Sequence, residues 1–207
     1  SLLFAPPSTL HPPLTPLISA LALHPTLETA LHLLNADLPS AHFLIRHMQA
    51  PPALEGMLLH ALLHRMEGDF DNARAWLGDA RDAGEGWVPK RRGEENLAGE
   101  DADANANTNS NAPLNSQSNA HTGEAERLLD AVEQFRKTPH SAETRDGVAH
   151  ALEARARREM ERILEWCVRK FGDGTWLDAR SAWVRPGDDV RRMGQEQVHR
   201  GNGMREF

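Results

Sequence analysis

The chain has 207 residues, of which 40% are hydrophobic and 26% are charged, and its formal net charge is −7. This size and composition predict one folded domain accompanied by flexible segments. The acidic balance argues against a general nucleic-acid or anionic-membrane surface, because such surfaces need a concentrated basic face.

Cysteine content and the first residues indicate an intracellular protein, cytoplasmic or nuclear. Cys167 is the single cysteine, so an internal disulfide is impossible and a reducing compartment is favoured. Residues 1–13 are interrupted by prolines and lack a basic start, so they do not form a signal peptide. No apolar run approaches the roughly 20 residues that cross a bilayer, and we expect no membrane segment. The chain begins with Ser1, as a trimmed chain would, so the lack of a leader is weak evidence about targeting.

The N-terminal part reads as an arm followed by helical hairpins. Residues 1–13 form a predicted extended arm in which Leu2, Leu3 and Phe4 are available for packing. Residues 14–88 then hold the hairpins. A short helix opened by Thr15-Pro16 runs to Leu23, and residues 26–35 and 38–48 form the first hairpin.

The second hairpin, residues 54–83, is the clearest element of the sequence. Apolar residues surround its first helix, 54–67, on most sides, which predicts a buried helix. Gly68 ends this helix, and Asp69 is the predicted N-cap of the next one. Arg65 lies on the apolar side and needs a carboxylate partner; the candidates are Glu28, Asp37 and Asp69.

The two hairpins repeat each other. A shift of 32 residues superimposes Leu27 on Leu59, His32 on His64, Asp37 on Asp69 and Ala41 on Ala73 without a gap. Repeat periods in the low thirties are typical of stacked helical hairpins.

Residues 22–84 resemble tetratricopeptide repeats. The small residue expected in the first helix is Ala61, and Ala73, Leu77 and Ala80 fit the second helix. The resemblance implies stacked hairpins with a protein-binding concave surface. The chain departs from the family at His60 and His64, where the repeat has large apolar or aromatic residues. The string HxxxHRxEGD, which begins at His60, also resembles one in small uncharacterised helical proteins, and this implies no activity.

The C-terminal half is predicted to complete the same domain after an interruption. Residues 89–122 are rich in Asn, Ala, Ser, Asp and Glu and form a predicted disordered insertion. Residues 123–185 hold helices at 123–137 and 142–171, the latter capped by Ser141, and a short helix from Trp176 to Trp183. Residues 186–207 form a predicted flexible tail. The fold class is therefore all-α.

One polar line on the helix 54–67 carries the candidate chemistry. His60, His64 and Glu67 are spaced i, i+4 and i+7, so they lie along one line of the helix surface. Imidazole and carboxylate ligands suit Zn²⁺, Fe²⁺ or Mn²⁺, with His32 or His42 of the neighbouring hairpin completing the site. The sequence lacks the glutamate of an HExxH metalloprotease. Two other interpretations are partly buried structural histidines and a metal-free acid–base pair.

No complete catalytic set is visible, so the sequence leaves open whether the protein is an enzyme. Helical repeats build interaction surfaces, and the sequence favours a protein-interaction or scaffold module whose partner is another protein. The alternative is a small metal-dependent enzyme with its site at His60, His64 and Glu67.

Overall fold

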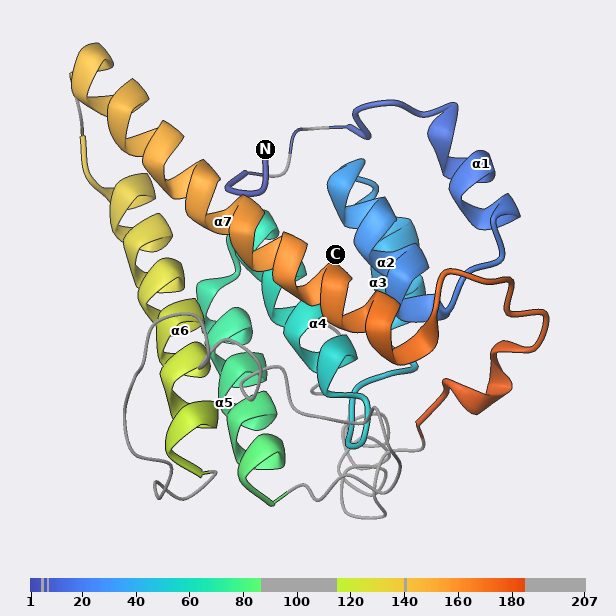
Figure 1. Ribbon diagram of the computed structural model, residues 1–207. Helices are drawn as coiled ribbons and strands as arrows, with labels where there is room; N and C mark the ends of the chain where they lie inside the picture. The colour runs from blue at the N-terminus through green and yellow to red at the C-terminus, as the bar shows by residue number, and fades with distance from the viewer. Residues whose placement is uncertain (5, 7, 87–114, 140, 185–207) are drawn as a thin grey trace, which may run out of the picture.

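A computed structural model of the chain describes residues 1–184, apart from residues 5, 7, 87–114 and 140. The described residues form helices and no strand, which confirms the all-α prediction. None of these helices combines the length and the apolar character that a bilayer crossing needs. The elements, shown in Figure 1, are α1 (Leu14–Ala20), α2 (Pro25–Leu34), α3 (Leu38–Ile45), α4 (Leu54–Glu67), α5 (Phe70–Gly86), α6 (Asn115–Lys137), α7 (Ala142–Phe171) and the short 3₁₀ helix η3 (Ala179–Ser181).

Helix ends agree with the sequence where a cap residue marks them. α4 ends at Gly68, whose φ of 90° is left-handed and favours glycine. α7 begins after Ser141, which accepts a hydrogen bond from the backbone N–H of Thr144, and ends at Gly172. α6 has no such signal: it begins at Asn115 instead of residue 123, so residues 115–122 of the predicted insertion are helical. Residues 89–114 of that insertion and the predicted tail, 186–207, lie outside the described residues.

The hairpins α2–α3 and α4–α5 share their local construction. Asp37 Oδ1 accepts from the backbone N–H of Ser40 at 3.3 Å, and Asp69 Oδ1 accepts from that of Asn72 at 3.2 Å. Ala41 and Ala73, which the shift of 32 residues also superimposes, are both fully buried. The two hairpins therefore share, at matching positions, an aspartate cap and a buried alanine.

A shared apolar core joins the arm, the hairpins and the C-terminal helices. In Figure 1, α7 runs diagonally across the molecule, with α2 and α3 on one side and α5 and α6 on the other. Leu3 of the arm is buried, and the backbone N–H of Leu2 donates to Glu153 on α7. The core includes Leu2, Leu3, Leu33, Ile45, Leu59, Leu62, Leu63, Leu128, Val132, Ala156, Met160 and Cys167.

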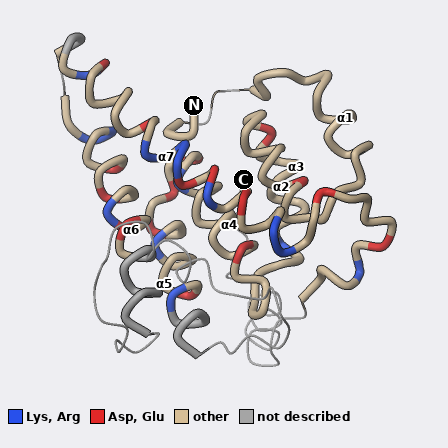
Figure 2. Tube along the Cα trace, viewed as in Figure 1, with Lys and Arg blue, Asp and Glu red and all other residues tan. Residues whose placement is uncertain are grey.

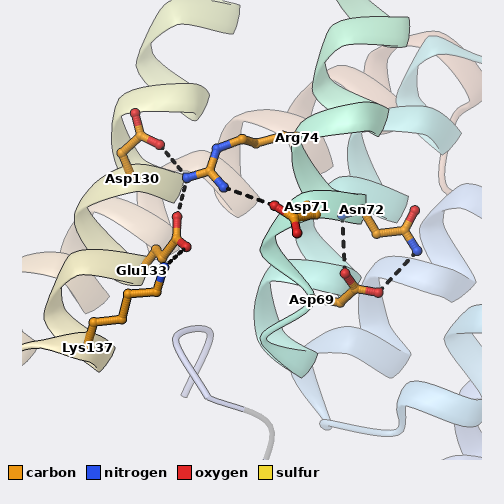
Figure 3. Close-up of polar contacts among 7 residues, drawn as sticks. All are labelled: Asp69, Asp71, Asn72, Arg74, Asp130, Glu133 and Lys137. Atoms are coloured by element: carbon orange, nitrogen blue, oxygen red, sulfur yellow. Dashed lines mark hydrogen bonds and ion pairs between the residues drawn. The ribbon is translucent and has the colours of Figure 1, made fainter.

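Charged side chains align α5 with α6 at the surface. Arg74 forms ion pairs with Asp130, at 2.7 Å, and with Glu133, and Lys137 also contacts Glu133 (Figure 3). Hydrogen bonds from Lys137 and Arg74 lower the pKa of Glu133, and those to Asp130 and Glu133 raise the pKa of Arg74. Figure 2 shows both basic and acidic residues along these two helices. Such solvent-exposed pairs each contribute little to stability.

Two less exposed ion pairs attach α7 to α4. Arg65 is buried, and its Nη2 lies 2.5 Å from Glu159 Oε2. Lys170 Nζ lies 3.3 Å from Glu55 Oε2. The partner of Arg65 is thus on α7, and not among the three carboxylates that the sequence suggested.

The segment after α7 folds back onto the first hairpin. The ring of Trp176 meets that of His24 edge-on at 4.5 Å, and its backbone N–H donates to Ala22. Trp183 packs beside His47 at a ring distance of 4.9 Å. Only η3 is helical here, in place of the longer helix predicted from Trp176 to Trp183.

His24 makes the fold sensitive to acid. Its imidazole caps α2 and stacks on Phe171 at 3.5 Å, and burial, helped by Lys170, lowers its pKa from 6.5 to about 3. Between these values the unfolded chain binds a proton that the folded chain does not, so stability falls as pH drops below 6.5. His24 should therefore remove about 2 kcal/mol of the free energy of unfolding between pH 7 and pH 5.

Urea denaturation of wild type and of His24→Asn at the two pH values measures this contribution. Asparagine retains the N-cap function but does not titrate. We expect the loss between pH 7 and pH 5 to be smaller in the variant by that amount. An equal loss in both proteins would show that folding does not lower the pKa of His24.

Candidate functional site

The candidate site lies where α3 meets α4. His42 belongs to α3, and His60 and His64 lie one turn apart on α4. The backbones approach each other closely at this contact: a Cβ atom added at Gly56 would lie only 2.4 Å from the carbonyl oxygen of Met48. Glycine at the start of α4 therefore lets this helix approach the segment that follows α3.

Three histidines converge at this contact. One ring nitrogen from each of His42, His60 and His64 lies within 4.8 Å of the other two. The ring centroids of His60 and His64 are 4.7 Å apart, and that of His42 lies 5.2 Å from the first and 5.7 Å from the second. The structure thus gathers three of the five predicted ligands.

His60 is the most enclosed member of this three-histidine cluster. Only 2% of it is exposed, and Trp76 of α5 stacks on its ring at 4.3 Å. Its Nδ1 lies 3.5 Å from the side-chain nitrogen of Gln49, whereas its Nε2 has no hydrogen-bond partner among the described residues. A buried polar atom without a partner costs about 1–3 kcal/mol, so this nitrogen calls for an explanation.

Glu67 lies beside the cluster and contacts it through His64. Its Oε2 is 2.9 Å from His64 Nδ1. The carboxylate accepts a hydrogen bond, so Nδ1 is the donor and Nε2 is the nitrogen that remains for another partner. Glu67, predicted as a ligand, is placed one hydrogen bond away from the three converging nitrogens.

His32, the remaining candidate, belongs to a different group. Its Nε2 lies 3.6 Å from Glu28, and its Nδ1 lies 3.3 Å from Asp37, although this second contact is not a hydrogen bond. Asp37 in turn accepts from the hydroxyl of Thr15. His32 is therefore engaged by carboxylates inside the first hairpin.

The environment of the cluster disfavours protonated imidazole. Burial, with smaller contributions from His64 and His42, lowers the pKa of His60 from 6.5 to about 3. Burial also lowers the pKa of His42, against the opposing charge of Glu67. Near neutral pH both rings therefore present lone pairs, which is the form that binds metals.

Sequence reasoning missed Gln49 and Trp76 as neighbours of the cluster. A signal for Trp76 exists: His60 and Trp76 are equally distant in sequence from Gly68, the turn between α4 and α5. Residues equidistant from the turn of an antiparallel hairpin lie opposite each other. Gln49 follows α3 in an irregular segment, and no periodic pattern indicates its contact.

The tetratricopeptide resemblance extends, in the structure, to several packed helices with two similarly capped hairpins. Assignment to that family stays a prediction. Neither the protein-family models nor the curated proteins nor the solved structures contain a match to this chain.

Proposed function

We propose that the protein binds a divalent transition-metal ion, Zn²⁺ in the first place, through His42, His60 and His64. The observation that carries the proposal is the buried, unpartnered Nε2 of His60, which lies within a cluster of three imidazoles. A metal ion bound to this nitrogen would satisfy it. Helix spacing supports the proposal, because His60 and His64 are i and i+4 and face the same side.

Zn²⁺ suits this donor set better than Mn²⁺ does. Three imidazole nitrogens favour zinc and its neighbours, whereas manganese prefers oxygen ligands, and Glu67 is engaged by His64. From Zn–N distances of about 2.0–2.1 Å, tetrahedral ligand nitrogens lie about 3.3 Å apart. Closing the cluster from 4.8 Å requires ring rotations, and His42, which is only partly buried, has room for them.

Metal content tests this proposal. Wild-type protein exposed to Zn²⁺ and then desalted should retain about one equivalent by mass spectrometry. His60→Ala should weaken the affinity, measured by competition with a chromophoric chelator, by more than about 100-fold, beyond the range for outer-shell partners. His150→Ala is the matched control, because His150 is exposed on α7.

The far-ultraviolet circular dichroism of both variants verifies that they are folded. Wild-type protein that retains no zinc, or a folded His60→Ala variant that binds as tightly as wild type, would overturn the proposal.

The interaction function favoured by the sequence stays a prediction, because no surface of the described residues identifies a partner. For metal binding, in contrast, the positions of His42, His60 and His64 support specific ligands.

A further inference from the structure

We infer that Glu67 positions His64 and does not bind the metal, and that the zinc ion therefore keeps one coordination position open to water or a small anion. This inference rests on the metal site proposed above. The number of protein ligands separates two kinds of zinc site. Sites with four protein ligands stabilise a fold, whereas sites with three accept an exchangeable ligand.

Glu67 sets the direction of the His64 ring. The contact of 2.9 Å between Glu67 Oε2 and His64 Nδ1 fixes one ring nitrogen as a donor. The other nitrogen, Nε2, lies on the far side of the ring and is left to bind the ion. Carboxylate–histidine–metal arrangements orient the ligand in this way and raise its basicity.

The cluster offers three ligands. Among the described residues, the histidine, cysteine and carboxylate atoms that converge here come from His42, His60 and His64 alone. Three ligands leave a tetrahedral ion one position short. Glu67 would have to give up His64 to fill that position, and His64 would then lose the partner of its Nδ1.

The cluster is covered on one side and partly exposed on the other. Trp76 covers one face of the His60 ring. In contrast, His42 is partly exposed, and 37% of the Glu67 side chain is exposed. The cluster thus has a buried side and a side toward solvent, from which water or an anion reaches the ion. A zinc ion with an open position would make its bound water more acidic and able to act as a nucleophile, so His42, His60 and His64 would hold the ion in the way that metal-assisted hydrolysis uses.

Zinc affinities of Glu67 variants test the positioning role. Glu67→Ala should weaken zinc binding about 10–100-fold, the range for outer-shell partners of metal-bound histidine. Glu67→Gln should recover much of this loss, because its carbonyl oxygen still accepts from Nδ1. Asp71→Asn, which removes one exposed carboxylate nearby, is the control and should bind like wild type. Equal affinity in wild type and Glu67→Ala would overturn the role of Glu67.

Cobalt substitution tests the open position. The visible spectrum of Co²⁺ reports its coordination number, and azide added to the wild-type cobalt protein should change that spectrum by entering the open position. Glu67→Gln should give the wild-type spectrum, because no ligand is lost. A spectrum that azide leaves unchanged would show that no position is open, and a Glu67→Gln spectrum that differs from that of wild type would identify Glu67 as a ligand. Either result would overturn the inference.

The metal site and its open position are tested by different results. If wild-type protein binds neither Zn²⁺ nor Co²⁺, the metal site itself is wrong. If it binds one equivalent that depends on His60 but is insensitive to azide, the metal site stands and the open position is wrong. Melting temperatures of the metal-free variants should agree within a few degrees, because Glu67 is partly exposed.

Discussion

Leu62→Ala should lower the free energy of unfolding by about 2–5 kcal/mol, the range for large-to-small substitutions in packed cores. Leu62 lies in the middle of α4, is 2% exposed and belongs to the shared core. Alanine leaves a cavity that the surrounding helices fill only in part. Urea denaturation monitored by circular dichroism gives the value.

Leu177→Ala provides the matched control, because Leu177 is 93% exposed. The same atoms are removed there without a cavity, and we expect a change within about 0.5 kcal/mol. A loss below about 1 kcal/mol for Leu62→Ala would mean that α4 is not a central element of the core. The burial of three of its leucines, Leu59, Leu62 and Leu63, argues otherwise.

Glu159→Ala should cost about 3–5 kcal/mol, because it leaves the buried guanidinium of Arg65 without a counter-charge. Arg65 is 3% exposed and Glu159 is 14% exposed, so water replaces the lost carboxylate poorly. Asp130→Ala is the contrasting control: its partner Arg74 is 39% exposed, and that pair is worth at most about 1 kcal/mol.

A double variant, Arg65→Met with Glu159→Leu, separates the value of the pair from the penalty of breaking it. Replacing both charges with apolar groups of similar volume should restore most of the stability, because no charge is then left buried alone. Denaturant midpoints of the two single variants and the double variant form a complete cycle. A double variant as unstable as Glu159→Ala would show that the ion pair itself holds α7 to α4.

Helices could be predicted from the sequence where the physical signal is local. Gly68 and Asp69 separate α4 from α5, and Ser141 and Gly172 delimit α7, because each residue supplies a cap or a backbone conformation of its own. The start of α6 at Asn115 lacks such a residue, and its polar composition resembles a linker. The composition of the segment therefore did not indicate where α6 begins.

The site was predictable within one helix and not across helices. Spacing alone places His60 and His64 on one side of α4, but it does not say which neighbouring residue packs opposite them. The close contact between Gly56 and Met48 brings α3, and with it His42, next to α4. His32 instead lies beside Asp37 within the first hairpin. The same limit applies to Arg65, whose partner Glu159 is far away in the sequence.

The repeated hairpin gives the site a simple relation to an ordinary structural contact. His32 and His64 occupy equivalent positions, and each ring nitrogen Nδ1 faces a carboxylate. Position 28 of the first hairpin, which is equivalent to His60, is glutamate, and its carboxylate lies 3.6 Å from the other ring nitrogen of His32, Nε2. Where the second hairpin has imidazole at this position, the ring of His64 lies beside the rings of His60 and His42. One exchange between the two hairpins, glutamate at position 28 and histidine at position 60, thus accompanies the difference between a histidine beside two carboxylates and the three-histidine cluster for which we propose metal binding.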